Sequence, residues 1–127
     1  MEKRRTIAID FDGVISNYQG YKGKGNFAPP VPGCKNFLDK LREEGWTIIV
    51  FTTRSEIPQI EAYMLEFRIP YDYINENPEN KKLDCSPWKI LADIYLDDRA
   101  ICFEGVYSKE LLTRIIDFQP WGNNDRL

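Results

Sequence analysis

A short apolar run that stops at two carboxylates is the feature that most constrains the fold of this chain. Thr6, Ile7, Ala8 and Ile9 are followed directly by Asp10, Phe11, Asp12 and Gly13. The apolar, partly β-branched run predicts a buried strand over residues 6–10. Because a buried carboxylate without compensation is costly, Asp10 and Asp12 should lie at the open end of this strand, where Gly13 permits a turn. Alone, these two acids fit either a solvated turn or half of a cation site.

Two later segments repeat the same design. Residues 47–51 form an apolar run that ends in Thr-Thr-Arg at 52–54, and residues 92–96 form another that ends in Asp-Asp-Arg at 97–99. If the strands are parallel, their carboxyl ends share one edge of the sheet. That edge is where open α/β sheets bind ligands.

This arrangement would crowd four acids together, namely Asp10, Asp12, Asp97 and Asp98. Like charges at short range raise one another's pKa and destabilise the fold unless a cation lies among them. Oxygen ligands, in a chain with no histidine, favour Mg²⁺ over Zn²⁺. A hydroxyl and basic side chains at the same edge suggest that a phosphate completes the site; these are Thr52, Arg54, Lys89 and Arg99.

These residues resemble the motifs of the haloacid dehalogenase (HAD) phosphohydrolase superfamily. Residues 10–14 (Asp-Phe-Asp-Gly-Val) resemble its first motif, residues 51–53 (Phe-Thr-Thr) its second, and residues 95–98 (Tyr-Leu-Asp-Asp) its fourth, with a basic residue ahead of the last as the third. The resemblance covers roughly residues 5–105. It implies one HAD-like hydrolase domain over residues 1–127, an α/β three-layer Rossmannoid sandwich with a mainly parallel five-stranded sheet and no cap domain.

The resemblance also implies a reaction, the hydrolysis of a phosphomonoester with Mg²⁺ as cofactor. Asp10 would attack phosphorus and form an aspartyl-phosphate, and the side chain of Asp12 would act as general acid and base. Asp10, Asp97 and the backbone carbonyl of Asp12 would bind the metal, and Asp98 would bind it directly or through water.

The remaining site residues follow from the same resemblance. Thr52 would hydrogen-bond the transferring phosphoryl group, with help from backbone N–H groups near Phe11, Asp12 and Thr53. Lys89 fits the position of the charge-neutralising lysine, and Lys81 and Lys82 compete with it. Arg54 and Arg99 would either orient the substrate or form surface ion pairs.

Three other interpretations compete with this one. An EF-hand calcium loop lacks its later acids here, because Val14 and Ser16 do not supply them. A receiver domain has a similar size, but it places its acidic pair on the first strand and a Thr and a Lys after its phosphoaccepting Asp. A non-catalytic or receiver-like module that binds Mg²⁺ and phosphate is the third.

The sequence between the motifs predicts the other elements. Glycines, prolines, lysines and tyrosines over residues 16–31 predict a loop above the acids, either a connector or a flap whose Tyr18 and Tyr21 meet the substrate. The pattern predicts helices over 32–45 and 57–67, a strand over 69–75, a loop over 75–87, a fifth strand over 100–103 and a surface tail over 119–127. Ser108 would cap a last helix, with Leu111, Leu112, Ile115 and Ile116 facing the core.

The composition limits the number of domains and the kinds of partner and compartment that we expect. The 127 residues suffice for one domain, and the net charge of −3 disfavours, without excluding, a nucleic-acid partner. Cys34, Cys85 and Cys102 are odd in number and widely spaced, which favours reduced thiols in a cytoplasmic protein. No segment is apolar enough to span a membrane. The partner we expect is a phosphorylated substrate, small or macromolecular, and a capless site leaves room for a homo-oligomer in which a neighbouring subunit is the lid.

Overall fold

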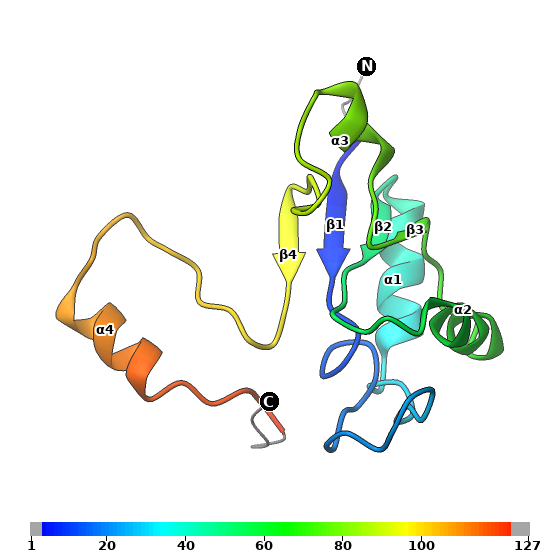
Figure 1. Ribbon diagram of the computed structural model, residues 1–127, viewed down its shortest axis with the longest axis horizontal. Helices are drawn as coiled ribbons and strands as arrows, with labels where there is room; N and C mark the ends of the chain where they lie inside the picture. Colours follow the sequence, from blue (N-terminus) through cyan, green and yellow to red (C-terminus); the bar gives the residue numbers. More distant parts are fainter. Residues whose placement is uncertain (1–3, 123–127) are drawn as a thin grey trace.

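A four-stranded parallel sheet forms the centre of the computed structural model, which describes residues 4–122 (Figure 1). Its strands are β1 (Thr6–Ile9), β2 (Thr47–Val50), β3 (Tyr73–Ile74) and β4 (Ile94–Leu96), in the order β3-β2-β1-β4. Each neighbouring pair is parallel, and Ile7 pairs with both Ile48 and Ile94. The carboxyl ends of β1, β2 and β4 therefore share one edge, as the sequence predicts. The protein is an α/β fold.

Two helices cover one face of this sheet. They are α1 (Cys34–Glu43) and α2 (Ile57–Glu66), and the predicted helices over 32–45 and 57–67 are confirmed within their ends. Side chains of β1 and β2 meet those of α1 and α2 in one core, which includes Ile7, Ile9, Ile48, Val50, Leu38, Ile60 and Met64. Each fully buried aliphatic side chain of this kind stabilises the fold by roughly 1.5–3 kcal/mol. The core thus fixes β1, whose end carries Asp10.

The loop over residues 16–31 is attached to this core and does not hang free. Phe27 packs edge-on against Phe11 and Tyr63, with ring centroids 5.0 and 5.7 Å away. The Tyr63 hydroxyl donates to the Ala28 carbonyl at 2.7 Å, and burial raises the pKa of that hydroxyl. The loop is therefore held over the carboxyl edge of the sheet, where Tyr18 and Tyr21 reach the site.

The segment predicted as a loop over residues 75–87 contains a short helix, α3 (Pro78–Lys82). Asn77 caps it by accepting a hydrogen bond from the Glu79 N–H at 3.0 Å. The buried Asn80 then ties the following chain down, since its amide donates to the carbonyls of Ser86 and Lys89 and accepts from the Leu91 N–H. Hydrogen bonds between asparagine side chains and the backbone therefore hold this segment in place, although it has no apolar helix face.

The predicted fifth strand over residues 100–103 is wrong. Within residues 4–122 the sheet has four strands, and residues 100–103 pair with none of them. The backbone N–H of Arg99 donates to the Asp97 carboxylate at 2.8 Å, which turns the chain at the end of β4. The apolar run that predicts a strand thus leaves the sheet before it can pair.

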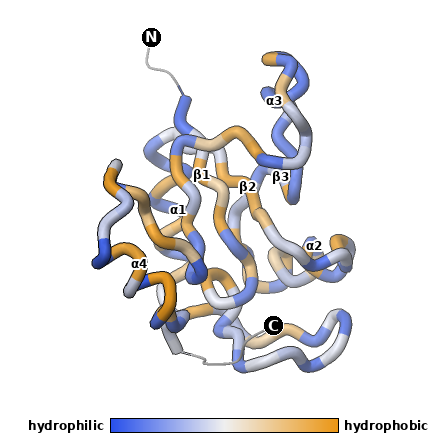
Figure 2. Tube along the Cα trace, turned by 60° about the vertical axis from the view of Figure 1, so that its left-hand side comes forward, coloured by the Kyte–Doolittle hydropathy of each residue, from blue (hydrophilic) through white to orange (hydrophobic). Residues whose placement is uncertain are grey.

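The last helix, α4 (Lys109–Ile116), forms where the sequence predicts it, but it does not face the core. Ser108 caps it as predicted, accepting from the Leu111 N–H at 3.0 Å. Leu112, Ile115 and Ile116 are all more than half exposed, and α4 lies away from the sheet (Figure 1). Figure 2 shows its hydrophobic residues along the outside of the molecule. The predicted core contacts of α4 are therefore wrong; nothing in the sequence pattern says which surface such a helix covers.

Three smaller expectations can also be compared with the structure. The cysteines Cys34, Cys85 and Cys102 are all free thiols. No helix within residues 4–122 is long and apolar enough to cross a membrane. The predicted tail over 119–127 lies partly outside the described residues.

Candidate functional site

Three carboxylates meet at the carboxyl edge of the sheet. Asp10 directly follows β1, and Asp97 and Asp98 directly follow β4, so the β1–β4 pairing brings them together. One oxygen from each lies within 4.8 Å of the others. Asp10 and Asp98 are half-buried and Asp97 is exposed. The sequence predicts that four acids crowd together at this edge, and three of them do so.

The absence of a side chain at Gly13 permits the close approach of Asp98. Gly13 has a φ of +86°, a conformation that side chains with a Cβ rarely adopt, and a Cβ there would overlap the Asp98 carboxylate. The Oδ1 atom of Asp98 is buried and has no hydrogen-bond partner among the described residues. An unsatisfied buried carboxylate oxygen beside two other carboxylates needs a positive group.

Burial raises the pKa of Asp10 to about 8, and its contact with Asp98 and the charge of Asp97 add to the rise. The Phe11 N–H, which donates to Asp10 Oδ1 at 2.9 Å, lowers this pKa and offsets part of the rise. An all-oxygen donor set with one unsatisfied member fits a hard divalent cation such as Mg²⁺. A bound cation would reverse the local balance and favour the ionised form of Asp10.

Asp12 does not join the three acids but pairs with Arg54. The guanidinium donates to both carboxylate oxygens, from Nε to Oδ2 at 2.6 Å and from Nη2 to Oδ1 at 3.0 Å. Ser16, which is fully buried, also donates to Asp12 Oδ1 at 3.4 Å. The side chain of Asp12 is therefore not a metal ligand in this geometry, which leaves its predicted metal role to the backbone carbonyl.

Besides Asp12, Arg54 contacts a second acid and two aromatic rings. Its Nη1 donates to Glu56 at 3.1 Å, and its guanidinium lies 4.7 Å from the ring centroid of Phe27 and 5.6 Å from that of Tyr21. Burial alone would lower the pKa of Arg54, but the bonds and charges of Asp12 and Glu56 raise it above its ordinary value. Arg54, which the sequence suggests as a substrate ligand, acts here as the residue that positions Asp12.

Thr52 and Thr53 follow β2 and occupy different positions. Thr53 lines the cavity beside Asp10, as predicted for a substrate contact. The backbone of Thr52 pairs with Asn75, whose Oδ1 accepts from the Thr52 N–H at 2.7 Å and whose Nδ2 donates to the Thr52 carbonyl at 2.9 Å. The Thr52 hydroxyl accepts from the Arg54 N–H at 3.1 Å, and Thr52 is not among the residues that line the cavity beside Asp10.

A cavity of about 340 Å³ opens over these groups. Its lining is Asp10, Asp12, Tyr18, Tyr21, Thr53, Arg54, Asp97, Asp98 and Arg99. Phe11 is not among them, since its ring is fully buried in the core and its N–H is bonded to Asp10. The Phe11 N–H, which the sequence predicts as a hydrogen-bond donor to the substrate, already donates to Asp10.

The predicted lysine is not brought to this cavity. Lys89 is exposed, and its ammonium group lies 5.4 Å from the centre of the Tyr95 ring. Its competitor Lys82 pairs with Glu79 at 3.2 Å and lines a different cavity. The position that the resemblance assigns to a lysine is thus filled by neither, and the cations that line the Asp10 cavity are Arg54 and Arg99.

Sequence reasoning missed three residues of the site. Glu56 and Asn75 act through Arg54 and Thr52, and no motif of the sequence marked them. Trp121 donates from Nε1 to the Gly13 carbonyl at 2.6 Å, although it lies in the predicted surface tail. A tryptophan in an otherwise polar stretch is the signal that could have indicated a docked side chain.

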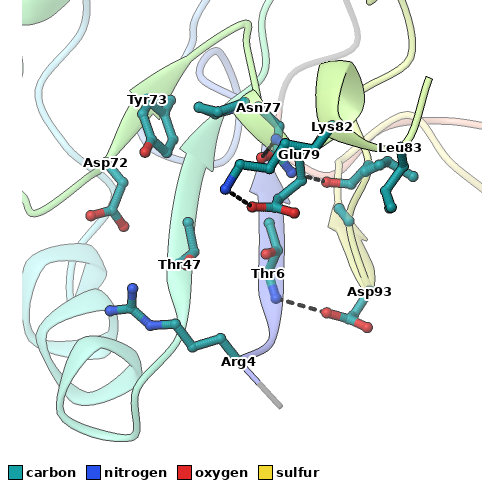
Figure 3. A pocket seen from close by; sticks show the side chains of 13 residues that line it. Arg4, Thr6, Thr47, Asp72, Tyr73, Asn77, Glu79, Lys82, Leu83 and Asp93 are labelled. Carbon is teal, nitrogen blue, oxygen red and sulfur yellow. Dashed lines mark hydrogen bonds and ion pairs between the residues drawn. The ribbon is translucent and has the colours of Figure 1, made fainter. Parts of the chain in front are cut away.

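A second cavity, of about 520 Å³, lies at the amino ends of β1 and β2 (Figure 3). Its polar groups bond with one another: Lys82 pairs with Glu79, and Asp93 accepts from the Thr6 N–H at 2.7 Å. Asp93 thus has a structural role at the start of β4, next to β1. The cavity lacks the converging acids of the carboxyl edge.

Comparisons with known proteins found similar folds among solved structures. A scan against protein-family models and a search of curated proteins both found no match. Among solved structures, a conserved protein from Bacteroides thetaiotaomicron is similar over 90% of this chain and 90% of its own, with a TM-score of 0.64 and 22% identity. A target protein from Vibrio cholerae is similar over 76% of this chain and 82% of its own, with a TM-score of 0.50 and 18% identity. At these identities the likeness concerns the α/β fold alone.

Proposed function

We propose that this protein is a Mg²⁺-dependent phosphomonoester hydrolase of the HAD type, built as one Rossmann-like three-layer domain without a cap. The observation that carries the proposal is the meeting of Asp10, Asp97 and Asp98, with the buried Asp98 Oδ1 left unsatisfied. Their origin at the ends of two adjacent parallel strands is the position where open α/β sheets bind ligands. The Asp98 carboxylate also occupies the space that a side chain at position 13 would fill, so a glycine there is needed for this arrangement.

In this proposal the chain's own residues supply nucleophile and proton transfer. A carboxylate oxygen of Asp10 forms a bond to phosphorus while the ester oxygen leaves with its electron pair. Protonated Asp12 gives that oxygen its proton. Water then attacks the aspartyl-phosphate, gives a proton back to Asp12, and releases inorganic phosphate and the Asp10 carboxylate.

The other residues hold the reacting groups in place. Asp10, Asp97 and Asp98 would hold the cation, and the Asp12 carbonyl would complete its ligands. Bound Mg²⁺ would supply charge neutralisation between the carboxylates and the phosphate. Arg54 holds the Asp12 carboxylate, and the Thr52 hydroxyl and the cavity-lining Arg99 would bind phosphoryl oxygens.

A non-catalytic, receiver-like module that binds Mg²⁺ and phosphate is the second candidate. Two observations favour it: both carboxylate oxygens of Asp12 are occupied by the Arg54 guanidinium, and Lys89 lies outside the cavity. In that case a phosphate would bind beside the cation without turnover.

The experiment that separates the two measures p-nitrophenyl phosphate hydrolysis with Mg²⁺ and with EDTA. A hydrolase shows turnover that EDTA removes and that Asp10→Asn reduces by on the order of 10⁴-fold. Lys89→Ala is the matched control, and from its place over Tyr95 we expect it to leave turnover within about twofold. Mg²⁺ binding by calorimetry without turnover of this ester, and without a beryllium fluoride adduct on Asp10, would leave the binding module.

The proposal extends to partner and compartment. The cavity of about 340 Å³ is at the small end for a ligand site, so it suits the phosphate end of a substrate whose remainder lies outside it. The substrate is therefore a phosphorylated molecule, small or macromolecular. Three free thiols fit a reducing compartment, and we place the protein in the cytoplasm.

A further inference from the structure

The exposed large apolar side chains of the described residues are concentrated on β4 and the segment that follows it. We call residues 97–121 the arm. Of the fifteen large apolar side chains that are exposed in the described part of the chain, ten lie on β4 or the arm. They are Ile94, Tyr95, Leu96, Phe103, Val106, Tyr107, Leu112, Ile115, Ile116 and Trp121. Single exposed apolar residues are normal on a protein surface, but a concentration of this kind indicates an interaction site.

The strand that begins this region is an unprotected edge. β4 pairs with β1 on one side and has no partner on the other within residues 4–122. Ile94 and Leu96 point to the face that carries Ile7 and Ile9, and Tyr95 points to the opposite face, yet all three are exposed. An apolar edge strand with an open row of backbone groups is a template for a further chain.

The arm carries the elements that would cover this edge. Residues 100–103 are an extended apolar run, and α4 presents Leu112, Ile115 and Ile116 on its surface. None of the residues of α4, all of which are described, is buried. The arm begins at the end of β4 and is held again where Trp121 bonds Gly13, so that α4 projects away from its own sheet between these two points (Figure 1).

We infer that a second copy of this chain covers these surfaces by mutual exchange of arms, with residues 100–116 of each copy packed on β4 of the other. Each chain displays both an uncovered apolar edge and the strand-like run and helix that match it, so a twofold arrangement satisfies both copies without another protein. The nine exposed apolar side chains of β4 and residues 97–116, at roughly 100 Å² each, amount to about 900 Å² per copy, which reaches the ~800 Å² per partner of a stable interface.

The test is the mass of the full chain in solution, by size-exclusion chromatography with light scattering. The chain has a mass of 14.9 kDa, and we expect a species of about twice that value. Ile115→Lys on α4 and Leu96→Glu on β4 should each give monomers. Leu65→Lys is the matched control, because Leu65 is equally apolar and 80% exposed but lies on α2, and this variant should stay dimeric.

Mixing the two disrupted variants tests the exchange itself. In an arm-exchanged heterodimer, the unaltered arm of the Leu96→Glu chain meets the unaltered β4 of the Ile115→Lys chain, while the introduced Glu and Lys meet each other. The mixture should therefore regain the dimer that neither variant forms alone. A monomeric wild-type chain at tens of micromolar would overturn the inference and show that the arm folds onto its own sheet or awaits another protein. A dimer insensitive to both substitutions, or one that mixing does not restore, would equally overturn it. Circular dichroism shows whether each variant is folded.

Discussion

β1 and β4 are neighbouring strands of the sheet, and α1 and α4 are both short amphipathic helices. The apolar side chains of β1 and Leu38 of α1 are buried, whereas those of β4 and most of those of α4 are exposed. Ile7, Ala8 and Ile9 of β1 are at most 5% exposed, whereas every residue of β4 is at least 39% exposed. α1 buries Leu38 at 1%, whereas Leu112 of α4 is 59% exposed. The packed half, residues 6–75, and the arm thus use the same local patterns with opposite outcomes.

The difference teaches that a periodic apolar pattern specifies an element but not the surface that covers it. Ser108 caps α4 and sets where it begins, which depends on residues within one turn. Burial of the apolar side chains of α4 depends on a surface elsewhere. In the packed half that surface comes from the same chain, and for the arm we infer that it comes from a second copy.

Matched leucine truncations measure this difference most directly. Leu38→Ala removes a buried side chain, and we expect it to lower the free energy of unfolding by about 2–4 kcal/mol at any protein concentration. Leu112→Ala should cost less than about 0.5 kcal/mol in dilute solution and more as the concentration rises, because its contacts form between copies. Urea denaturation at two protein concentrations gives both values.

The same experiment can break the comparison. A cost of Leu112→Ala that equals that of Leu38→Ala at the lowest concentration would mean that α4 packs on its own chain. The two halves would then be one continuous core.

Two glycines, one in each half, provide a second matched pair with a smaller effect. Gly13 and Gly105 have φ values of +86° and +94°, so an alanine at either position is strained by roughly 1 kcal/mol. At Gly105 nothing described lies within 4 Å of the added Cβ, whereas at Gly13 the Cβ overlaps Asp98. Gly13→Ala should therefore cost about 1–2 kcal/mol more than Gly105→Ala.

A second readout on these variants separates strain from loss of the site. Gly13→Ala displaces Asp98 and should weaken Mg²⁺ binding in calorimetry at least tenfold, while Gly105→Ala should leave it unchanged. Equal Mg²⁺ affinity in both variants would contradict the packing of Asp98 against Gly13.

The parts of the fold and site that sequence predicts correctly are those where a local pattern fixes a position. Apolar runs that end in acids predict β1 and β4, and parallel pairing then brings Asp10, Asp97 and Asp98 to one edge. The buried faces of α1 and α2 follow from helical spacing around Leu38, Ile60 and Met64. These predictions need no knowledge of which side chains meet across the fold.

The parts that fail depend on partners distant in sequence. The ion pair of Arg54 with Asp12 joins residues on two different loops, and only the fold shows which acid Arg54 pairs with. Residues 100–103 read as a strand, yet the turn at Asp97 directs them away from the sheet.

The carboxylate cluster contains Asp10, which follows β1, and Asp97 and Asp98, which begin the arm, and its pH dependence gives a further prediction. Burial, Asp98 and Asp97 raise the pKa of Asp10 to about 8 from an ordinary value of 3.8. Between these values the native protein keeps a proton that the unfolded chain releases, so the free energy of unfolding falls as the pH rises from about 4 to 8. Each pH unit between these values corresponds to about 1.4 kcal/mol, so in EDTA the free energy of unfolding should fall by up to about 4 kcal/mol between pH 5 and pH 8, and the melting temperature should drop by roughly ten degrees or more. Mg²⁺ should restore most of this loss at pH 8, where Asp10 can ionise beside it.

Asp97→Asn tests the contribution of the neighbouring charge. It removes one of the charges that raise the pKa of Asp10, so it should flatten the pH dependence of the melting temperature in EDTA. It should also reduce the stabilisation by Mg²⁺. A melting temperature that rises from pH 5 to pH 8 without metal would show that the acids do not repel one another, and the link between the halves would then be packing at Gly13 and Trp121 alone.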